Sequence, residues 1–224
     1  MGSKFRTLFL TLLQILVVLC ITSCAVSPVK MSAFREFDVP KVEINNKIPL
    51  RAGLYLSQGF KNASFYSFPK GRGIKANPIA SHHSFIGDAL ISSSQKAVKN
   101  IFQDVVILDG KENDVELKAK QIDMIVTPEL VKVDSIFLAY FSFTECDYTI
   151  KTLVKWTIAS LAGVELYSNT ITSDEIRITV KKPITQEEKL KEAIILSLQD
   201  NFKRAQEDIY SSGWWKNQWW KNSK

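Results

Sequence analysis

Residues 149–171, with the sequence TIKTLVKWTIASLAGVELYSNTI, decide the fold that we predict. Residues 149–158 are rich in Thr, Ile, Val and Trp, the residue types that favour a β-strand. Gly163 marks a turn, and residues 164–171 return as a second strand. Because the connection is short, we expect the two strands to be antiparallel neighbours.

Strands are also predicted on both sides of this hairpin. Within residues 48–56, apolar Leu50 and Leu54 alternate with Arg51 and Tyr55, as in a half-buried strand. Pro49 fits only near the start of such a strand or on an edge. Further strands are predicted over residues 104–108, 122–133 with a bend at Pro128, 136–141 and 176–180.

Two helices are predicted from apolar residues at helical spacing. The first begins near Ser84, with Ser81 or Ser84 as its N-cap. The second begins at Thr185, which makes a capping box with Glu188, and it ends at Gly213. Its apolar stripe consists of Leu190, Ile194, Leu198, Phe202, Ala205 and Ile209. This order of elements predicts an α+β fold, with a mostly antiparallel sheet and the two main helices packed on one face.

The N-terminal segment has the features of a secretory signal. Lys4 and Arg6 precede an apolar run over residues 8–19. The run is shorter than the roughly 20 apolar residues of a spanning helix. An uncleaved N-terminal anchor is the alternative.

Ile21-Thr22-Ser23-Cys24 follows the apolar run and resembles the lipobox of bacterial lipoproteins. The resemblance implies a diacylglycerol on Cys24, palmitate as a further acyl group, and cleavage before this residue. Membrane lipid would then be one partner of the chain. Ala25 stands where some lipoproteins carry an Asp that retains them in the inner membrane. We therefore expect a lipid-anchored protein of the outer membrane that faces the periplasm.

These features divide the chain into four parts. They are a signal peptide (1–23), a flexible tether (24–46), a single α+β domain (47–211) and a Trp/Lys-rich tail (212–224). The tether prediction rests on Pro28 and Pro40 and on the lack of periodicity, and an edge strand around Val42 and Ile44 is the alternative. About 200 residues remain after the signal, enough for one domain with a real core.

The domain resembles small envelope lipoproteins of the curli-secretion and lipopolysaccharide-assembly kind. The matching stretches are Gly87-Asp88-Ala89-Leu90, residues 98–102 with Val105, residues 122–128 and the hairpin 154–166. The resemblance covers much of residues 48–205. It supports the predicted fold more than a function. Separately, we expect a non-enzymatic envelope protein with another envelope protein as its partner.

Several function classes have little support in the composition. Without Lys4 and Arg6 the formal net charge falls from +6 to +4, spread along the chain, which argues against a nucleic-acid partner. Cys146 would be the only free thiol of the mature chain. It lies between Glu145 and Asp147, and these acids would raise its pKa and weaken it as a nucleophile.

The sequence also predicts no metal site and no cofactor. Its only histidines, His82 and His83, are neighbours that would point in opposite directions on a strand, so solvated loop histidines are the favoured interpretation. There is no HExxH, CxxC or Gly-x-Ser-x-Gly motif. Gly71-Arg72-Gly73 lacks the third glycine of a phosphate-binding fingerprint. We therefore expect a protein that is not an enzyme.

A stretch over residues 59–81 mixes aromatic and basic side chains and lacks periodicity. It is predicted to be a long loop. As a ligand loop it would use Phe60, Lys61, Phe65, Tyr66, Lys70 and Arg72. Such residues suit an anionic lipid, a glycan or a protein partner. The alternative is that the aromatic side chains pack onto the protein.

The C-terminal tail holds four of the five tryptophans, Trp214, Trp215, Trp219 and Trp220. Tryptophan beside lysine is typical of membrane interfaces. Docking to a protein partner and packing onto the protein's own core are the other two interpretations.

Two functions follow from these patterns. The first is a membrane-anchored accessory or assembly component of the bacterial cell envelope. The second is a lipoprotein that captures an anionic or glycan ligand with residues 59–81. A wall-active hydrolase, with two facing carboxylates in a cleft, is a third class.

Overall fold

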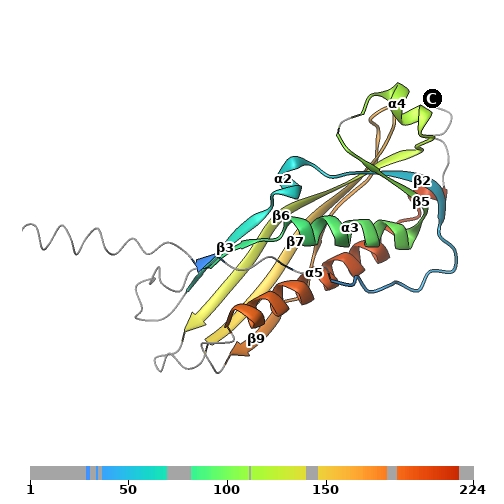
Figure 1. Cartoon of the computed structure of the whole chain (residues 1–224). Coiled ribbons are helices and arrows are strands. Elements are labelled where there is room, and N and C mark those ends of the chain that lie inside the picture. Colours follow the sequence, from blue (N-terminus) through green and yellow to red (C-terminus); the bar gives the residue numbers. More distant parts are fainter. Residues whose placement is uncertain are drawn as a thin grey trace, which may run out of the picture.

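The computed structural model describes residues 29–30, 34, 37–69, 82–110, 112–139, 146–180 and 186–216. The signal peptide, Cys24 and the connection 70–81 lie outside the described residues. The elements, drawn in Figure 1, are β1 (Val29–Lys30), β2 (Ile48–Tyr55), α2 (Gln58–Lys61), β3 (Ser64–Pro69), β4 (His82–Phe85), α3 (Gly87–Ile101), β5 (Phe102–Leu108), α4 (Asp114–Ala119), β6 (Met124–Ala139), β7 (Cys146–Ser160), β8 (Glu165–Thr172), β9 (Ile176–Val180), α5 (Gln186–Ser211) and the 3-10 turn η3 (Trp214–Lys216).

The predicted α+β class is confirmed, and the described sheet is mixed. Its long central strands β6 and β7 are antiparallel, and β7 pairs antiparallel with both β8 and β9. On the other side of β6, strands β2 and β3 pair with it in parallel, and β5 is parallel to β2. β4 returns antiparallel to β3. The hairpin of residues 149–171 is confirmed as β7 and β8.

One long strand replaces two predicted ones in the region 122–141. We predicted a bend at Pro128 and a separate strand over 136–141, but β6 runs unbroken from Met124 to Ala139. A proline is tolerated here because β2 pairs with β6 only up to Val126 and β3 joins only from Ile136. Between these points β6 has β7 as its one described strand neighbour, so no ladder on the other side needs an N–H from Pro128. The irregularity lies instead in a bulge between Leu130 and Lys132.

Helices α3 and α5 lie side by side on one face of the sheet, as Figure 1 shows and as predicted. The predicted stripe of α5 is buried throughout, from Leu190 to Ile209. Trp156 of β7 meets Phe202 of α5 edge-on, with ring centroids 5.7 Å apart. A hydrogen bond of 3.0 Å from Asn100 to Gln206 joins α3 to α5. The main core therefore fills the space between these helices and the sheet.

A buried polar group links α5 to the sheet within this core. Asn201 Nδ2 donates hydrogen bonds to the carbonyl oxygens of Thr152 (3.0 Å) and Ile171 (2.7 Å). The hydroxyls of Ser173 and Ser197 are 2.8 Å apart. These contacts set the position of α5 along β7 and β8, because an unpaired polar group would be costly here.

Part of the predicted tether packs against the domain. Phe37 is buried and stacks with Phe202, with ring centroids 6.5 Å apart. Gln199 and Gln206 of α5 donate hydrogen bonds to the carbonyl oxygens of Asp38 (2.8 Å) and Pro40 (3.1 Å). Residues 37–40 are therefore bound to α5 rather than free, and no strand forms at residues 42–44.

The start of the first helix also differs from the prediction. Ser84 lies in β4 and is buried, and α3 begins at Gly87 without a side-chain N-cap. The predicted loop over 59–81 is wrong for most of residues 59–69, because residues 59–61 belong to α2 and residues 64–69 form β3. A single helical turn forms at α2 because the Ser57 side chain accepts the N–H of Phe60 at 3.2 Å. Thr185, the predicted cap of α5, lies outside the described residues.

Candidate functional site

A small second hydrophobic cluster lies on the face of the sheet opposite α3 and α5. Leu54, Val126 and Ile158 belong to the main core, and their neighbours Tyr55, Ile125 and Ala159 point the other way because strand side chains alternate. Leu108, Leu117 and Ile122 are the buried residues of this cluster. Helix α4, at one end of the sheet in Figure 1, covers it with Leu117.

Local sequence explains why α4 forms. Asn113 Oδ1 accepts the N–H of Glu116, and Glu116 Oε2 accepts the N–H of Asn113, both at 3.0 Å. This capping box satisfies backbone donors at the first turn. The helix ends before Gln121, whose φ of 55° turns the chain back toward β6. We did not predict this helix, although the spacing of Asn113 and Glu116 was a readable signal.

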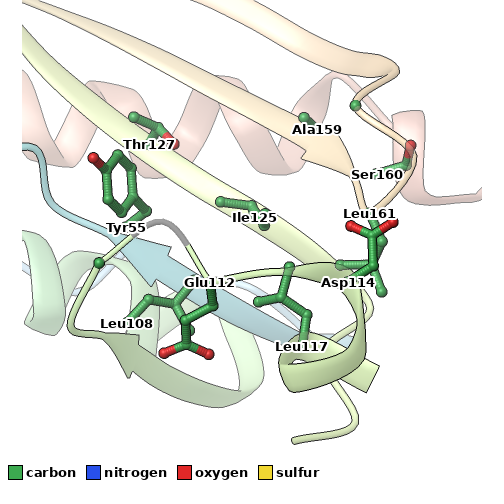
Figure 2. A pocket seen from close by; sticks show the side chains of 12 residues that line it. Tyr55, Leu108, Glu112, Asp114, Leu117, Ile125, Thr127, Ala159, Ser160 and Leu161 are labelled. Carbon is green, nitrogen blue, oxygen red and sulfur yellow. The ribbon is translucent and has the colours of Figure 1, made fainter. Parts of the chain in front are cut away.

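The cluster borders a pocket of about 510 Å³. In Figure 2, Leu117 points from α4 toward β6, on which Ile125 lies. Tyr55 and Thr127 lie at one end of the view, and Asp114 and Leu161 lie at the other. The described residues that line the pocket are Tyr55, Leu108, Gly110, Glu112, Asp114, Leu117, Ile125, Thr127, Ala159, Ser160, Leu161 and Gly163. None of them was a predicted site residue, because they come from four separate stretches of the chain.

One carboxylate at the pocket belongs to an ion pair. Glu112 Oε1 lies 2.6 Å from Lys120 Nζ, and its side chain is only 11% exposed. This hydrogen bond raises the pKa of Lys120 above its ordinary value. The second oxygen, Oε2, is buried without a hydrogen-bond partner among the described residues. Glu112 and Asp114 do not point toward each other in Figure 2, so they do not form the facing pair of a hydrolase.

Three other polar groups that line the pocket have no hydrogen-bond or ion-pair partner in the part of the chain that the structure describes. The side chains of Tyr55, Thr127 and Asp114 make no hydrogen bond or ion pair with any residue that the structure describes. Ser160, in contrast, accepts the N–H of Val164 at 3.1 Å. Two hydroxyls and one carboxylate therefore remain available to water or to a ligand.

The predicted ligand loop separates into buried and exposed parts. Phe60 and Phe65 are buried in the main core, as in the alternative that we considered. Tyr66 is 49% exposed and stacks on His83, its cross-strand partner, with ring centroids 4.2 Å apart. Lys61 is partly exposed at the end of α2. Lys70 and Arg72 lie outside the described residues.

His83 is not a solvated loop residue. It lies in β4, and its Nε2 is buried without a hydrogen-bond partner among the described residues. The centroid of its ring lies 4.3 Å from that of Phe85. Phe85 is 49% exposed. Tyr66, His83 and Phe85 thus form an aromatic strip on β3 and β4. No three His, Cys, Asp or Glu side chains gather as metal ligands in the part of the chain that the structure describes.

The first half of the Trp-rich tail packs on the protein. Trp214 and Trp215 are partly buried against the main core. Trp215 Nε1 donates a 3.3 Å hydrogen bond to the Tyr210 carbonyl oxygen, and its ring lies 5.7 Å from that of Tyr210. Trp219 and Trp220 lie outside the described residues. None of the described helices combines the length and apolar composition needed to span a bilayer.

No protein-family model and no curated protein matches this sequence. Among solved structures, protein XCC0632 from Xanthomonas campestris, of the family model DUF330, is 8% identical with a TM-score of 0.43, covering 83% of this chain and 99% of that one. A protein described as a neuraminyllactose-binding hemagglutinin homolog from Helicobacter pylori is 6% identical with a TM-score of 0.40, covering 83% and 97%. A third structure, described as an uncharacterized protein, is 5% identical with a TM-score of 0.31, covering 80% and 99%. At these values the likeness assigns neither a family nor a function to this chain.

Proposed function

We propose that this chain is a lipid-anchored, non-enzymatic accessory or assembly component of the bacterial cell envelope. The observation that carries the proposal is Cys24, which ends a lipobox-like sequence directly after a basic start and an apolar run. Each buried methylene of an acyl chain contributes roughly 0.8 kcal/mol, and two or three chains anchor a protein stably. The outer membrane, facing the periplasm, is the expected location.

The domain offers a surface on which a protein partner can bind. The strand register places Tyr66, Phe85 and Ile136 on one face, because Phe85 pairs opposite Ser64 and Ile136 pairs beside Phe68. Each is at least 37% exposed. Exposed aromatic and aliphatic side chains that gather on one face are typical of interaction sites. We take this face as the partner surface.

Two measurements test the proposal. The wild type should incorporate an alkyne analogue of palmitate and remain with the membrane fraction, whereas Cys24→Ala should do neither. Labelling and membrane retention of the variant would contradict the anchor. A Cys146→Ala variant is the matched control, and it should label as the wild type does.

The partner surface is tested by photo-crosslinking in intact cells. A benzophenone side chain at position 66 or 85 should capture the same envelope protein. A benzophenone at Leu196, which is exposed on α5, should not capture it. Equal capture from all three positions, or none from positions 66 and 85, would contradict a specific partner on this face.

The second candidate, a lipoprotein that captures an anionic or glycan ligand, has one supporting observation. A hollow of about 340 Å³ lies beside α2 and is lined by Phe60, Asn62 and Glu129 among others. Glu129 disfavours an anion there, so a neutral glycan is the better ligand. Binding of a neutral oligosaccharide that is lost in Asn62→Ala would support this function, and equal binding by the variant would contradict it.

A further inference from the structure

The pocket beneath α4 shares no residue with the partner surface. It is built on the small hydrophobic cluster, and its volume of about 510 Å³ falls within the roughly 300–1,000 Å³ of small-molecule sites. Leu108, Leu117, Ile125, Ala159 and Leu161 provide apolar walls on several sides. A hollow of this size and lining favours the apolar body of a small organic molecule.

The charged residues that line the pocket indicate which charge the ligand's polar group should carry. The described lining residues include two carboxylates, Glu112 and Asp114, and no lysine or arginine. Lys120 neutralises Glu112 through their 2.6 Å ion pair. Asp114 has no partner among the described residues. Lys111 lies outside the described residues. Asp114, which has no ion pair with a described residue, is therefore the carboxylate at which a cation is favoured.

The far end of the pocket offers hydrogen bonds rather than charge. Tyr55 and Thr127 line it with hydroxyl groups that have no described protein partner. In Figure 2 these two residues lie at the opposite end from Asp114. A ligand that fills the pocket can therefore meet the carboxylate at one end and the hydroxyls at the other.

We propose that this pocket binds a small amphipathic cation, a molecule with an ammonium group, a flat or branched apolar body and a hydrogen-bonding group at its far end. The ammonium group lies at Asp114, the apolar body lies between Leu117 and Ile125, and the far group bonds to Tyr55 and Thr127. Binding does not require the lipid anchor, so failure of this proposal leaves the proposed envelope function intact.

Tyramine is a suitable probe because it combines an ammonium group, an aromatic ring and a phenol. We would titrate it by calorimetry into the full-length chain in detergent micelles. Phenethylamine, which lacks the phenol, and 4-(2-hydroxyethyl)phenol, which lacks the charge, are the matched ligands. Tyramine should bind saturably and about fivefold more tightly than the neutral phenol, as expected for a partly exposed ion pair.

Variants of the chain identify the groups responsible. Asp114→Asn should remove the preference for tyramine over the neutral phenol, and Tyr55→Phe should remove its preference over phenethylamine. Ala159→Trp should fill the pocket and abolish binding of both amines. Val115→Trp, on the 77% exposed face of α4, should leave binding unchanged.

Three results would overturn the proposal. They are the absence of saturable binding to the wild type, equal affinity for tyramine and the neutral phenol, and unchanged tyramine binding by Ala159→Trp. Thermal unfolding of each variant is measured in parallel. If Ala159→Trp fails to fold, Asp114→Asn decides the outcome alone, because its side chain is exposed and its loss leaves the core intact.

Discussion

Gly87, the first residue of α3, lies so close to Lys61, the last residue of α2, that a Cβ on Gly87 would stand 1.7 Å from the Lys61 carbonyl oxygen. The N–H of Ile86 also donates a 2.9 Å hydrogen bond to the Ala63 carbonyl oxygen. Only a residue without a side chain allows this approach of two backbone segments. Gly87 therefore sets how α3 enters the core.

The first prediction is that Gly87→Ala destabilises the domain by about 3 kcal/mol, because backbone must move to relieve the overlap. Chemical denaturation of the purified chain measures the loss. Gly110→Ala is the control, since a Cβ there has nothing within 4 Å, and it should change the free energy of unfolding by less than about 0.5 kcal/mol. Equal stability of the two variants would contradict the close approach.

The second prediction concerns the buried amide of Asn201. Replacing it by leucine leaves the carbonyl oxygens of Thr152 and Ile171 without their side-chain donor. We expect a loss of about 2–4 kcal/mol, because both buried carbonyl oxygens lose a hydrogen bond and the packing changes, although the Thr152 oxygen keeps its hydrogen bond from the Ser173 N–H. Lys203→Leu, on the exposed side of the same helix, should cost below about 0.5 kcal/mol. A small loss for Asn201→Leu would show that these hydrogen bonds are dispensable.

The third prediction is a loss of stability in alkali that depends on Tyr167. Burial, and then its 2.5 Å hydrogen bond to Asp208 Oδ2, raise the pKa of Tyr167 above the ordinary value of about 10. The unfolded chain loses this proton near pH 10, while the folded chain retains it. The contribution to stability is therefore complete below pH 10 and decreases as the pH rises above it.

Urea unfolding between pH 8 and 11 tests this dependence. Tyr167→Phe should show a shallower decrease in stability above pH 10 than the wild type. Tyr210→Phe, which leaves the Tyr167–Asp208 hydrogen bond in place, should keep the wild-type slope. Identical slopes for the wild type and Tyr167→Phe would refute the assignment.

The fourth prediction separates the two halves of the Trp-rich tail. Trp215→Ala should destabilise the domain by about 1–2 kcal/mol, because it removes partly buried surface and the contact with Tyr210. Trp219→Ala should leave the melting temperature unchanged and reduce binding to vesicles that contain anionic lipid. If Trp215→Ala melts like the wild type, packing of the tail on the core contributes nothing to stability.

The periodic segments could be predicted from the sequence, and the pairing of strands could not. The stripe of α5 is visible at every turn, so its buried face from Leu190 to Ile209 follows from spacing alone. Pro128 misled the prediction of β6, because the penalty of a proline depends on whether a neighbouring strand needs its N–H. On one side of β6 the possible neighbours are β2 and β3, which are remote in the sequence and which pair with β6 only before and after Pro128.

The candidate site was harder to predict than the strand pairing, because it is built from residues that are distant in the sequence. Phe60 and Phe65 looked like ligand contacts because aromatic and basic residues mix there, yet both are core residues. The pocket residues escaped prediction because they come from four stretches that only the fold brings together. The capping box of Asn113 and Glu116 is a local signal for α4, the helix that covers the pocket, and it could have been read from the sequence.

The sequence by itself determined the fold class, the two main helices and the hairpin of β7 and β8, because apolar periodicity and turn residues act over a few positions. The sequence is also the basis of the hypothesis that Cys24 carries a lipid anchor, because the lipobox-like motif is short and contiguous. Only the tertiary structure decided that β2 lies between β5 and β6, that residues 37–40 bind α5, and that Tyr55, Asp114 and Ala159 share one pocket. These features form when segments distant in the sequence bury apolar surface against one another. The free energy of this burial depends on all the segments together, so no single stretch of sequence predicts it.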